Sequence, residues 1–158
     1  MNTTSRILVE ATRNVRPPTE EELTDPYQAY NYAKDIIRGR WPEGEATIAT
    51  EPHSAYCYAR NVLMGRFPEG EASIATNPLN AYEYARLVIR GRFPEGGATI
   101  AKDPHWAYPY ARNVIGGRFP EGEAAIATDP YLAPAYLRAF PEAKLEWVIN
   151  GWLDWLDL

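Results

Sequence analysis

The chain has 158 residues, a formal net charge of −5 and a single cysteine, Cys57. No segment is basic enough to predict a nucleic-acid-binding surface, and no apolar run approaches the roughly 18 residues that a membrane span requires. A lone cysteine cannot pair within the chain, and the N-terminus has no long apolar stretch of a secretory signal. We therefore expect a cytoplasmic protein.

Residues 1–24 resemble a degenerate repeat and are expected to form an N-terminal cap. ATRNV at 11–15 is similar to YARNV at 58–62 further along the chain. Thr19 followed by Glu22 matches a capping box, in which the two residues satisfy each other's backbone N–H groups at a helix start.

A 26-residue unit then occurs four times without insertion, at 25–50, 51–76, 77–102 and 103–128, which we call the first to fourth repeats. A fixed period of this length is typical of stacked solenoids, in which each repeat packs mainly on its neighbours. We predict an all-α solenoid of stacked long-helix/short-helix repeats with N- and C-terminal caps.

The long helix of the first repeat is predicted to begin with Asp25 as N-cap and Pro26 at the first helical position. Its apolar face comprises Ala29, Tyr30, Ala33, Ile36 and Ile37. Gly39 is expected to end this helix as a left-handed residue, with Gly65, Gly91 and Gly117 in the same role. The short helix should begin near Pro42 and direct Ala46, Ile48 and Ala49 inward.

Residues 129–158 are expected to form a degenerate fifth repeat and an amphipathic capping helix over about 142–156. Its apolar face would comprise Leu145, Val148, Ile149, Trp152 and Leu156. Trp147, Trp152 and Trp155 cannot all face one neighbour, so they are candidates for contact with a protein partner or with a second copy of the chain. The alternative is that the cap covers them.

Every repeat has one arginine followed three residues later by a glutamate. The arginines are Arg40, Arg66, Arg92 and Arg118, and the glutamates are Glu43, Glu69, Glu95 and Glu121. Stacking is expected to align them as two ladders of paired charges. The alternative is an anion-binding groove of arginines, which the nearby carboxylates disfavour. Paired carboxylates such as Glu43 and Glu45 recur in three of the four repeats.

Two tyrosines also recur in each repeat, two residues apart. One ladder is Tyr30, Tyr56, Tyr82 and Tyr108, and the other is Tyr32, Tyr58, Tyr84 and Tyr110. We expect both to be packing residues with hydrogen-bonded hydroxyls. The alternative is a series of platforms for stacking RNA bases, which the acidic charge disfavours.

The positions that vary between repeats lie at spacings of 3, 4 and 3 on one face of the long helix. We call this set the variable stripe; it comprises Gln28, Asn31, Asp35, Arg38, Ser54, Cys57, Asn61, Met64, Asn80, Glu83, Leu87, Arg90, Trp106 and Asn113, with Pro109 and Gly116 completing the fourth repeat. It is either solvated surface or a partner-binding surface. Its large apolar members favour recognition.

No pattern predicts a metal site, a catalytic group or a cofactor. His53 and His105 occupy equivalent positions two repeats apart, which is too far for one ion. No serine, cysteine or lysine has a histidine base at a recognisable spacing, and no glycine loop matches a phosphate-binding motif. We expect a protein that is not an enzyme.

The unit DP-x-x-AY-x-YA-x-x-VI-x-GR-[W/F]-PE-x-E-x-x-I resembles a short helical-hairpin repeat of uncharacterised tailed-phage and giant-virus proteins. The segments at 29–49 and 107–130 carry the resemblance. The chain departs from it in having PEGEA in place of PEAEP, which should loosen the short helix, and in having Gly97 where the other repeats have Glu. The resemblance implies a viral protein in the host cytoplasm, without known chemistry or transferable site residues.

The repeats and the variable stripe predict a non-enzymatic protein-binding module, and the resemblance implies an inhibitor or adaptor that acts on a host protein such as an immune effector. Two alternatives stay open: a reader of anionic ligands or RNA through the arginine and tyrosine ladders, and a self-associating scaffold.

Overall fold

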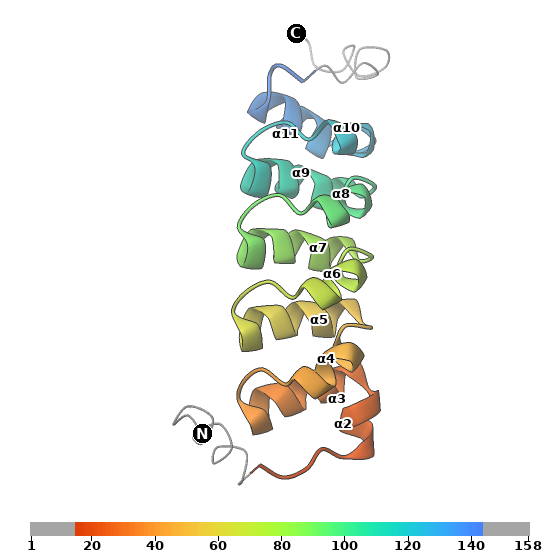
Figure 1. The fold of residues 1–158 in the computed structure, drawn as a ribbon. Coiled ribbons are helices and arrows are strands. Elements are labelled where there is room, and N and C mark those ends of the chain that lie inside the picture. Colours follow the sequence, from red (N-terminus) through yellow and green to blue (C-terminus); the bar gives the residue numbers. More distant parts are fainter. Residues whose placement is uncertain (1–14, 144–158) are drawn as a thin grey trace. The chain divides into compact units, whose positions relative to one another are not determined.

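The computed structural model describes residues 15–143, which form helices and turns (Figure 1). These residues contain no strand and alternate long and short helices in the 26-residue period, so the predicted all-α repeat architecture is confirmed. The chain divides into two compact units, residues 1–70 and 71–158, and each is described by itself. The capping helix expected at 142–156, with Trp147, Trp152 and Trp155, lies outside the described residues, as does most of the N-terminal cap.

The first unit begins with α2 (Glu20–Thr24) and contains the first repeat and most of the second. Its further helical elements are α3 (Pro26–Asn31), η2 (Tyr32–Ile37), α4 (Pro42–Ile48), α5 (Pro52–Tyr58), η3 (Ala59–Leu63) and the start of α6 (Pro68–Ile74). The capping box of Thr19 and Glu22 is present at the start of α2, as the sequence predicted.

The second unit contains the third and fourth repeats and part of a fifth. Its helical elements are the end of α6, then α7 (Pro78–Glu83), η4 (Tyr84–Ile89), α8 (Pro94–Ile100), α9 (Pro104–Tyr110), η5 (Ala111–Ile115), α10 (Pro120–Ile126) and α11 (Leu132–Ala139). Within this unit α7 packs against α8 and α9, and α9 packs against α10 and α11.

The predicted N-caps of the long helices are confirmed. Asp25 accepts a hydrogen bond from the backbone N–H of Gln28, and a proline follows it at the first helical position. Glu51 and Asn77 likewise accept from the residue three positions later, Asp103 accepts from His105 two positions later, and a proline follows each of them. A side-chain acceptor satisfies N–H groups that the first helical turn leaves without partners.

The C-terminal half of each long helix is wound as a π-helix, and this moves the predicted stop by one residue. The left-handed residues are Arg38, Met64, Arg90 and Gly116, one position before the glycines that the sequence indicated. The backbone N–H groups of Arg38 and Gly39 both donate to the carbonyl of Ala33. These two bonds place the turn at Arg38, so the helix ends one residue before Gly39.

This geometry predicts opposite tolerance of alanine at two adjacent glycines of the fourth repeat. Gly116 has a φ of 65°, whereas a Cβ at Gly117 would meet no atom closer than 3.8 Å. Gly116→Ala should lower the free energy of unfolding by about 1 kcal/mol, because a Cβ disfavours the left-handed conformation. Gly117→Ala should change it by less than about 0.5 kcal/mol. Urea denaturation of both variants measures the difference, and equal effects would contradict the placement of the turn.

The core of each unit consists of residues that recur in every repeat. Ile48, Ile74, Ile100 and Ile126 are fully buried, as are Phe67 and Phe93. The prediction that Ala46 faces inward is wrong, because Ala46 is exposed and its neighbours Gly44 and Glu45 are buried. The short helix thus turns its glycine and its second glutamate, and not its alanine, toward the long helices.

The glycine of each PEG segment allows an aromatic ring to lie against the short helix. A Cβ at Gly96 would lie 2.6 Å from Cδ1 of Phe93 and 2.8 Å from the Cβ of Ala81. Both neighbours are fully buried, so neither side chain has room to move. PEGEA therefore does not simply loosen the helix; its glycine allows the close packing.

A second pair of adjacent glycines tests this packing. Gly96→Ala should lower the free energy of unfolding by about 1–3 kcal/mol through overpacking. Gly97→Ala should raise it by up to about 1 kcal/mol, because Gly97 is helical and a Cβ there would meet no atom within 4 Å. Thermal unfolding of the two variants under identical conditions gives the comparison. A Gly96→Ala protein as stable as the wild type would refute the close approach.

Candidate functional site

A buried tyrosine hydroxyl joins consecutive repeats in the first unit. The Tyr58 hydroxyl accepts a hydrogen bond from the backbone N–H of Trp41 at 2.9 Å and donates one to Glu45 Oε1 at 3.0 Å. The same carboxylate accepts two bonds from Arg40, Nε to Oε1 at 2.6 Å and NH2 to Oε2 at 2.9 Å. We call this arrangement of arginine, glutamate and the tyrosine of the following repeat a connector.

The second unit contains an equivalent connector at the end of the fourth repeat. Tyr136 accepts from the backbone N–H of Phe119 and donates to Glu123, each at 2.8 Å. Arg118 donates to both oxygens of Glu123 at 2.8 Å. Since the tyrosine ring is fully buried and the arginine is partly exposed, each connector runs from the core to the surface.

The connectors correct the predicted pairing of each arginine with the glutamate three residues later. Arg40 and Arg118 bind the glutamate five residues later, and Glu43, Glu69, Glu95 and Glu121 are exposed. Residues two apart on an α-helix project about 200° apart, so Glu43 faces solvent when Glu45 faces the core. The recurrence of the second glutamate in three of the four repeats was the sequence signal for its role.

The connectors shift the pKa values of their members. The guanidinium of Arg118 is the main cause that holds the pKa of Glu123 below its usual range, and the Tyr136 hydroxyl acts in the same direction. Arg40 and then Tyr58 act likewise on Glu45. Burial raises the pKa of Tyr136 to about 12, so its hydroxyl stays a donor well above neutral pH.

Both tyrosine ladders pack inside the protein, as expected. In one ladder Tyr30, Tyr56 and Tyr82 are buried and Tyr108 is partly buried. In the other, Tyr32, Tyr58, Tyr84 and Tyr110 are at most 3 % exposed. Rings covered in this way offer no open face for stacking a base.

Several members of the variable stripe serve the packing, although Asn61 and Asn113 are also exposed. Ser54 and Asn80 are buried. Asn61 donates to the Tyr30 hydroxyl at 2.8 Å, and Asn113 donates to the Tyr82 hydroxyl at 3.0 Å. These asparagines therefore connect long helices of adjacent repeats inside each unit.

Other stripe residues lie in local contacts or at the surface. Gln28, Asn31, Cys57, Glu83, Leu87, Trp106 and Pro109 are partly buried, and Asp35, Arg38, Met64, Arg90 and Gly116 are exposed. The Trp106 ring lies 5.7 Å from that of Tyr82, and the Glu83 carboxylate pairs with Arg86 at 3.0 Å. Cys57 Sγ lies 3.5 Å from Nε2 of His53, and burial raises the pKa of its thiol. Among the large apolar residues of 15–143, Met64 is the most exposed, at 85 %.

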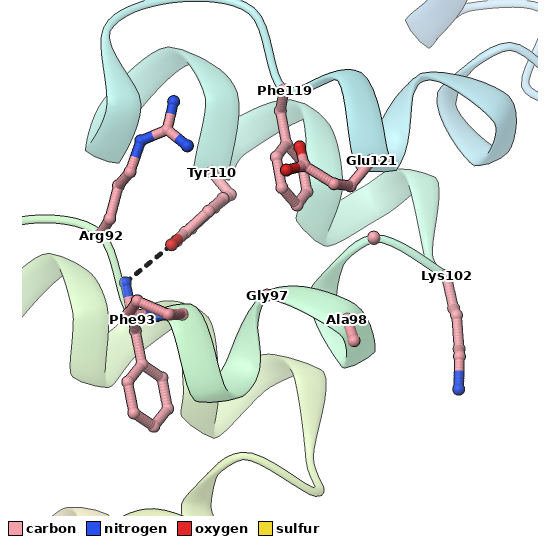
Figure 2. A pocket seen from close by; sticks show the side chains of 10 residues that line it. Arg92, Phe93, Gly97, Ala98, Lys102, Tyr110, Phe119 and Glu121 are labelled. Atoms are coloured by element: carbon pink, nitrogen blue, oxygen red, sulfur yellow. Dashed lines mark hydrogen bonds between the residues drawn. The ribbon is translucent and has the colours of Figure 1, made fainter.

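Each unit has a groove beside its short helices. The groove of the first unit has a volume of about 510 Å³ and is lined by Arg40, Val62, Leu63, Arg66, Pro68 and Glu69. The groove of the second unit has a volume of about 540 Å³, and Arg92, Phe93, Gly97, Tyr110 and Glu121 are among its lining residues (Figure 2). The sequence indicated a groove of arginines only as the disfavoured alternative, and Gly97 marked the place of the second groove.

Residues 15–143 contain no cluster of three or more histidine, cysteine or carboxylate side chains suited to holding a metal ion. Over the same range, no helix combines the length and the apolar character needed to cross a membrane. No family model, curated protein or solved structure matches the chain. The resemblance to viral repeats therefore stays a prediction.

The lowered pKa of Glu123 predicts a specific acid sensitivity. A carboxylate whose pKa is lower in the folded state stabilises the fold fully above its unfolded pKa, near 4.3, and loses that contribution as the pH falls through the folded pKa. Glu123→Gln should cost about 1–2 kcal/mol at pH 7, through the bonds to Arg118 and Tyr136. It should also flatten the fall in stability below about pH 4.5.

Urea denaturation at a series of pH values measures both effects. Glu121→Gln is the charge-matched control, because it removes an exposed carboxylate from the same helix, α10. If both variants altered the pH profile equally, the effect would come from net charge and not from the connector.

Proposed function

We propose that the protein is a non-enzymatic binding module that recognises a protein partner through the surface around Met64. The observation that carries the proposal is the exposed apolar side chain of this residue, at a left-handed position where the first and third repeats have the charged residues Arg38 and Arg90. Met64 is left-handed, with a φ of 52°, and its side chain is 85 % exposed. The equivalent residue of the fourth repeat is Gly116, which adopts that conformation without strain.

Met64 thus departs from two local preferences at once. A left-handed conformation costs a residue with a Cβ roughly 1–2 kcal/mol, and an exposed thioether side chain contributes nothing to the core. The left-handed turn itself recurs in every repeat, but an exposed apolar side chain on it does not, and departures that the fold does not need are expected at functional sites. Methionine is also well suited to recognition, because its flexible, polarisable side chain adapts to the shape of a partner.

The groove of the first unit extends this surface. Val62 and Leu63, which line it, directly precede Met64 in the chain and are partly buried. Arg40, Arg66 and Glu69 border the same groove, so apolar and charged groups stand side by side. An apolar anchor surrounded by charged groups is the usual composition of a protein-protein contact.

The partner that fits the resemblance to viral repeats is a host protein, and the module would act as an inhibitor or adaptor in the host cytoplasm. Recognition of RNA is disfavoured, because the tyrosine ladders are buried and their hydroxyls serve the packing. Contact through Trp147, Trp152 and Trp155, with a partner or a second copy, is an alternative.

The decisive variant is Met64→Gly, because it removes the side chain and relieves the backbone at once. It should raise the free energy of unfolding by up to about 1 kcal/mol, so that lost binding cannot result from unfolding. Arg38→Gly is the matched control, since Arg38 is an exposed residue of the first repeat with the same left-handed conformation.

Affinity capture from a bacterial host lysate, followed by calorimetry with the purified partner, makes the test. We expect Met64→Gly to weaken binding about tenfold or more, and Arg38→Gly to preserve it. A partner that binds both variants as tightly as the wild type would reject the Met64 surface and direct attention to the C-terminal tryptophans.

A further inference from the structure

The third repeat has an incomplete connector. In the first and fourth repeats a glutamate accepts hydrogen bonds from an arginine and from the tyrosine of the next repeat. The equivalent of that glutamate in the third repeat is Gly97, while the arginine (Arg92) and the next tyrosine (Tyr110) are both present. The third repeat therefore has both hydrogen-bond donors, but it lacks the glutamate that accepts from them in the first and fourth repeats.

The tyrosine of this connector keeps its hydrogen bond to the turn of the third repeat. The Tyr110 side chain is 2 % exposed, and its hydroxyl accepts a hydrogen bond from the backbone N–H of Phe93 at 2.8 Å, as Tyr136 does from Phe119. Figure 2 shows the hydroxyl directed at that nitrogen, with Arg92 at the adjacent position of the chain. Within residues 15–143 no carboxylate accepts the Tyr110 proton and none forms an ion pair with Arg92.

The place of the missing carboxylate is open space. Arg92, Gly97 and Tyr110 line the groove of about 540 Å³ in the second unit. A Cβ at Gly97 would meet no atom within 4 Å, so a side chain can leave this position without a clash beside the groove that Gly97 lines. The groove is also lined by Lys102 and Glu121, and together with Arg92 they give it one net positive charge.

We propose that this groove is a binding site for a carboxylate. The carboxylate of the ligand takes the place of the absent glutamate, accepting hydrogen bonds from the Arg92 guanidinium and from the Tyr110 hydroxyl. A guanidinium binds a carboxylate through two parallel hydrogen bonds, and a buried donor without an acceptor favours a ligand that supplies one. The single excess positive charge fits a monocarboxylate, either a free small acid or a glutamate or aspartate side chain of a bound peptide.

Propionate is the matching probe, because it has the length of the glutamate side chain beyond Cα. The ¹⁵N-labelled protein is titrated with sodium propionate into the tens of millimolar range, at constant ionic strength against chloride. We expect saturable shifts of the Arg92 Nε–H and Phe93 N–H resonances. Linear shifts, equal to those that chloride causes, would overturn the proposal.

Two substitutions at one position provide the controls. Gly97→Glu supplies the carboxylate within the chain and should abolish the response to propionate, whereas Gly97→Ala should keep it. Arg92→Gln should weaken binding about tenfold or more, since a charge-assisted pair of hydrogen bonds is lost. A Gly97→Glu protein that responds as the wild type does would place the ligand elsewhere.

A second carboxylate-binding site should be created by removing the glutamate of the connector in the fourth repeat. Glu123→Gly leaves Arg118 and Tyr136 as the third repeat leaves Arg92 and Tyr110. Propionate should raise the thermal midpoint of this variant more than that of the wild type, because it has two sites and not one. Equal increases in the two proteins would count against carboxylate recognition by the connector.

A parallel titration with a short peptide that contains one glutamate and has both termini blocked separates the two sources of the ligand. Binding of the peptide more tightly than propionate identifies a protein side chain, and the reverse identifies a free acid. If neither shifts the Arg92 resonance, the proposal fails, whatever the outcome at Met64.

Discussion

The packing depends on the hydrogen bonds of one group, the tyrosine hydroxyl through which a long helix contacts the preceding repeat. In the first and fourth repeats it satisfies a backbone N–H of the turn and a carboxylate at the same time. A buried hydroxyl of this kind is costly without partners, so the turn, the short helix and the next long helix must all be in register. The PEG glycine recurs for a related reason, because a Cβ there would meet the ring of the tryptophan or phenylalanine three residues earlier.

The period, the helix class, the N-caps and most of the core could be predicted from the sequence, because each depends on local spacing repeated four times. The π-helical turns could not, since the shift of the left-handed residue from Gly39 to Arg38 depends on which carbonyl closes the turn. The pairing of Arg40 with Glu45 was missed for a related reason. Sequence spacing alone does not show which of two glutamates faces a hydroxyl contributed by the following repeat.

The two proposed sites are both exceptions to the repeat. Met64 places an exposed apolar side chain at a left-handed position where the other repeats have arginine or glycine, and Gly97 lacks a side chain where the fold elsewhere uses glutamate. Neither exception improves the packing of its own repeat. In an array of near-identical repeats, such departures are the residues least determined by stacking, and they are consequently the clearest candidates for recognition.

The incomplete connector also bears on how far unfolding spreads. Repeats in a linear array are stabilised mainly by their nearest neighbours, so local opening propagates until it meets a strong interface and begins at a weak one. The junction between the third and fourth repeats keeps the bond from Phe93 to Tyr110 but lacks the ion pair that closes the junction after the fourth repeat. This junction is therefore a weak interface within the second unit, and amide hydrogen exchange can distinguish the opening of the repeats on its two sides. A carboxylate bound in the Arg92 groove would determine whether the third and fourth repeats open independently or as one.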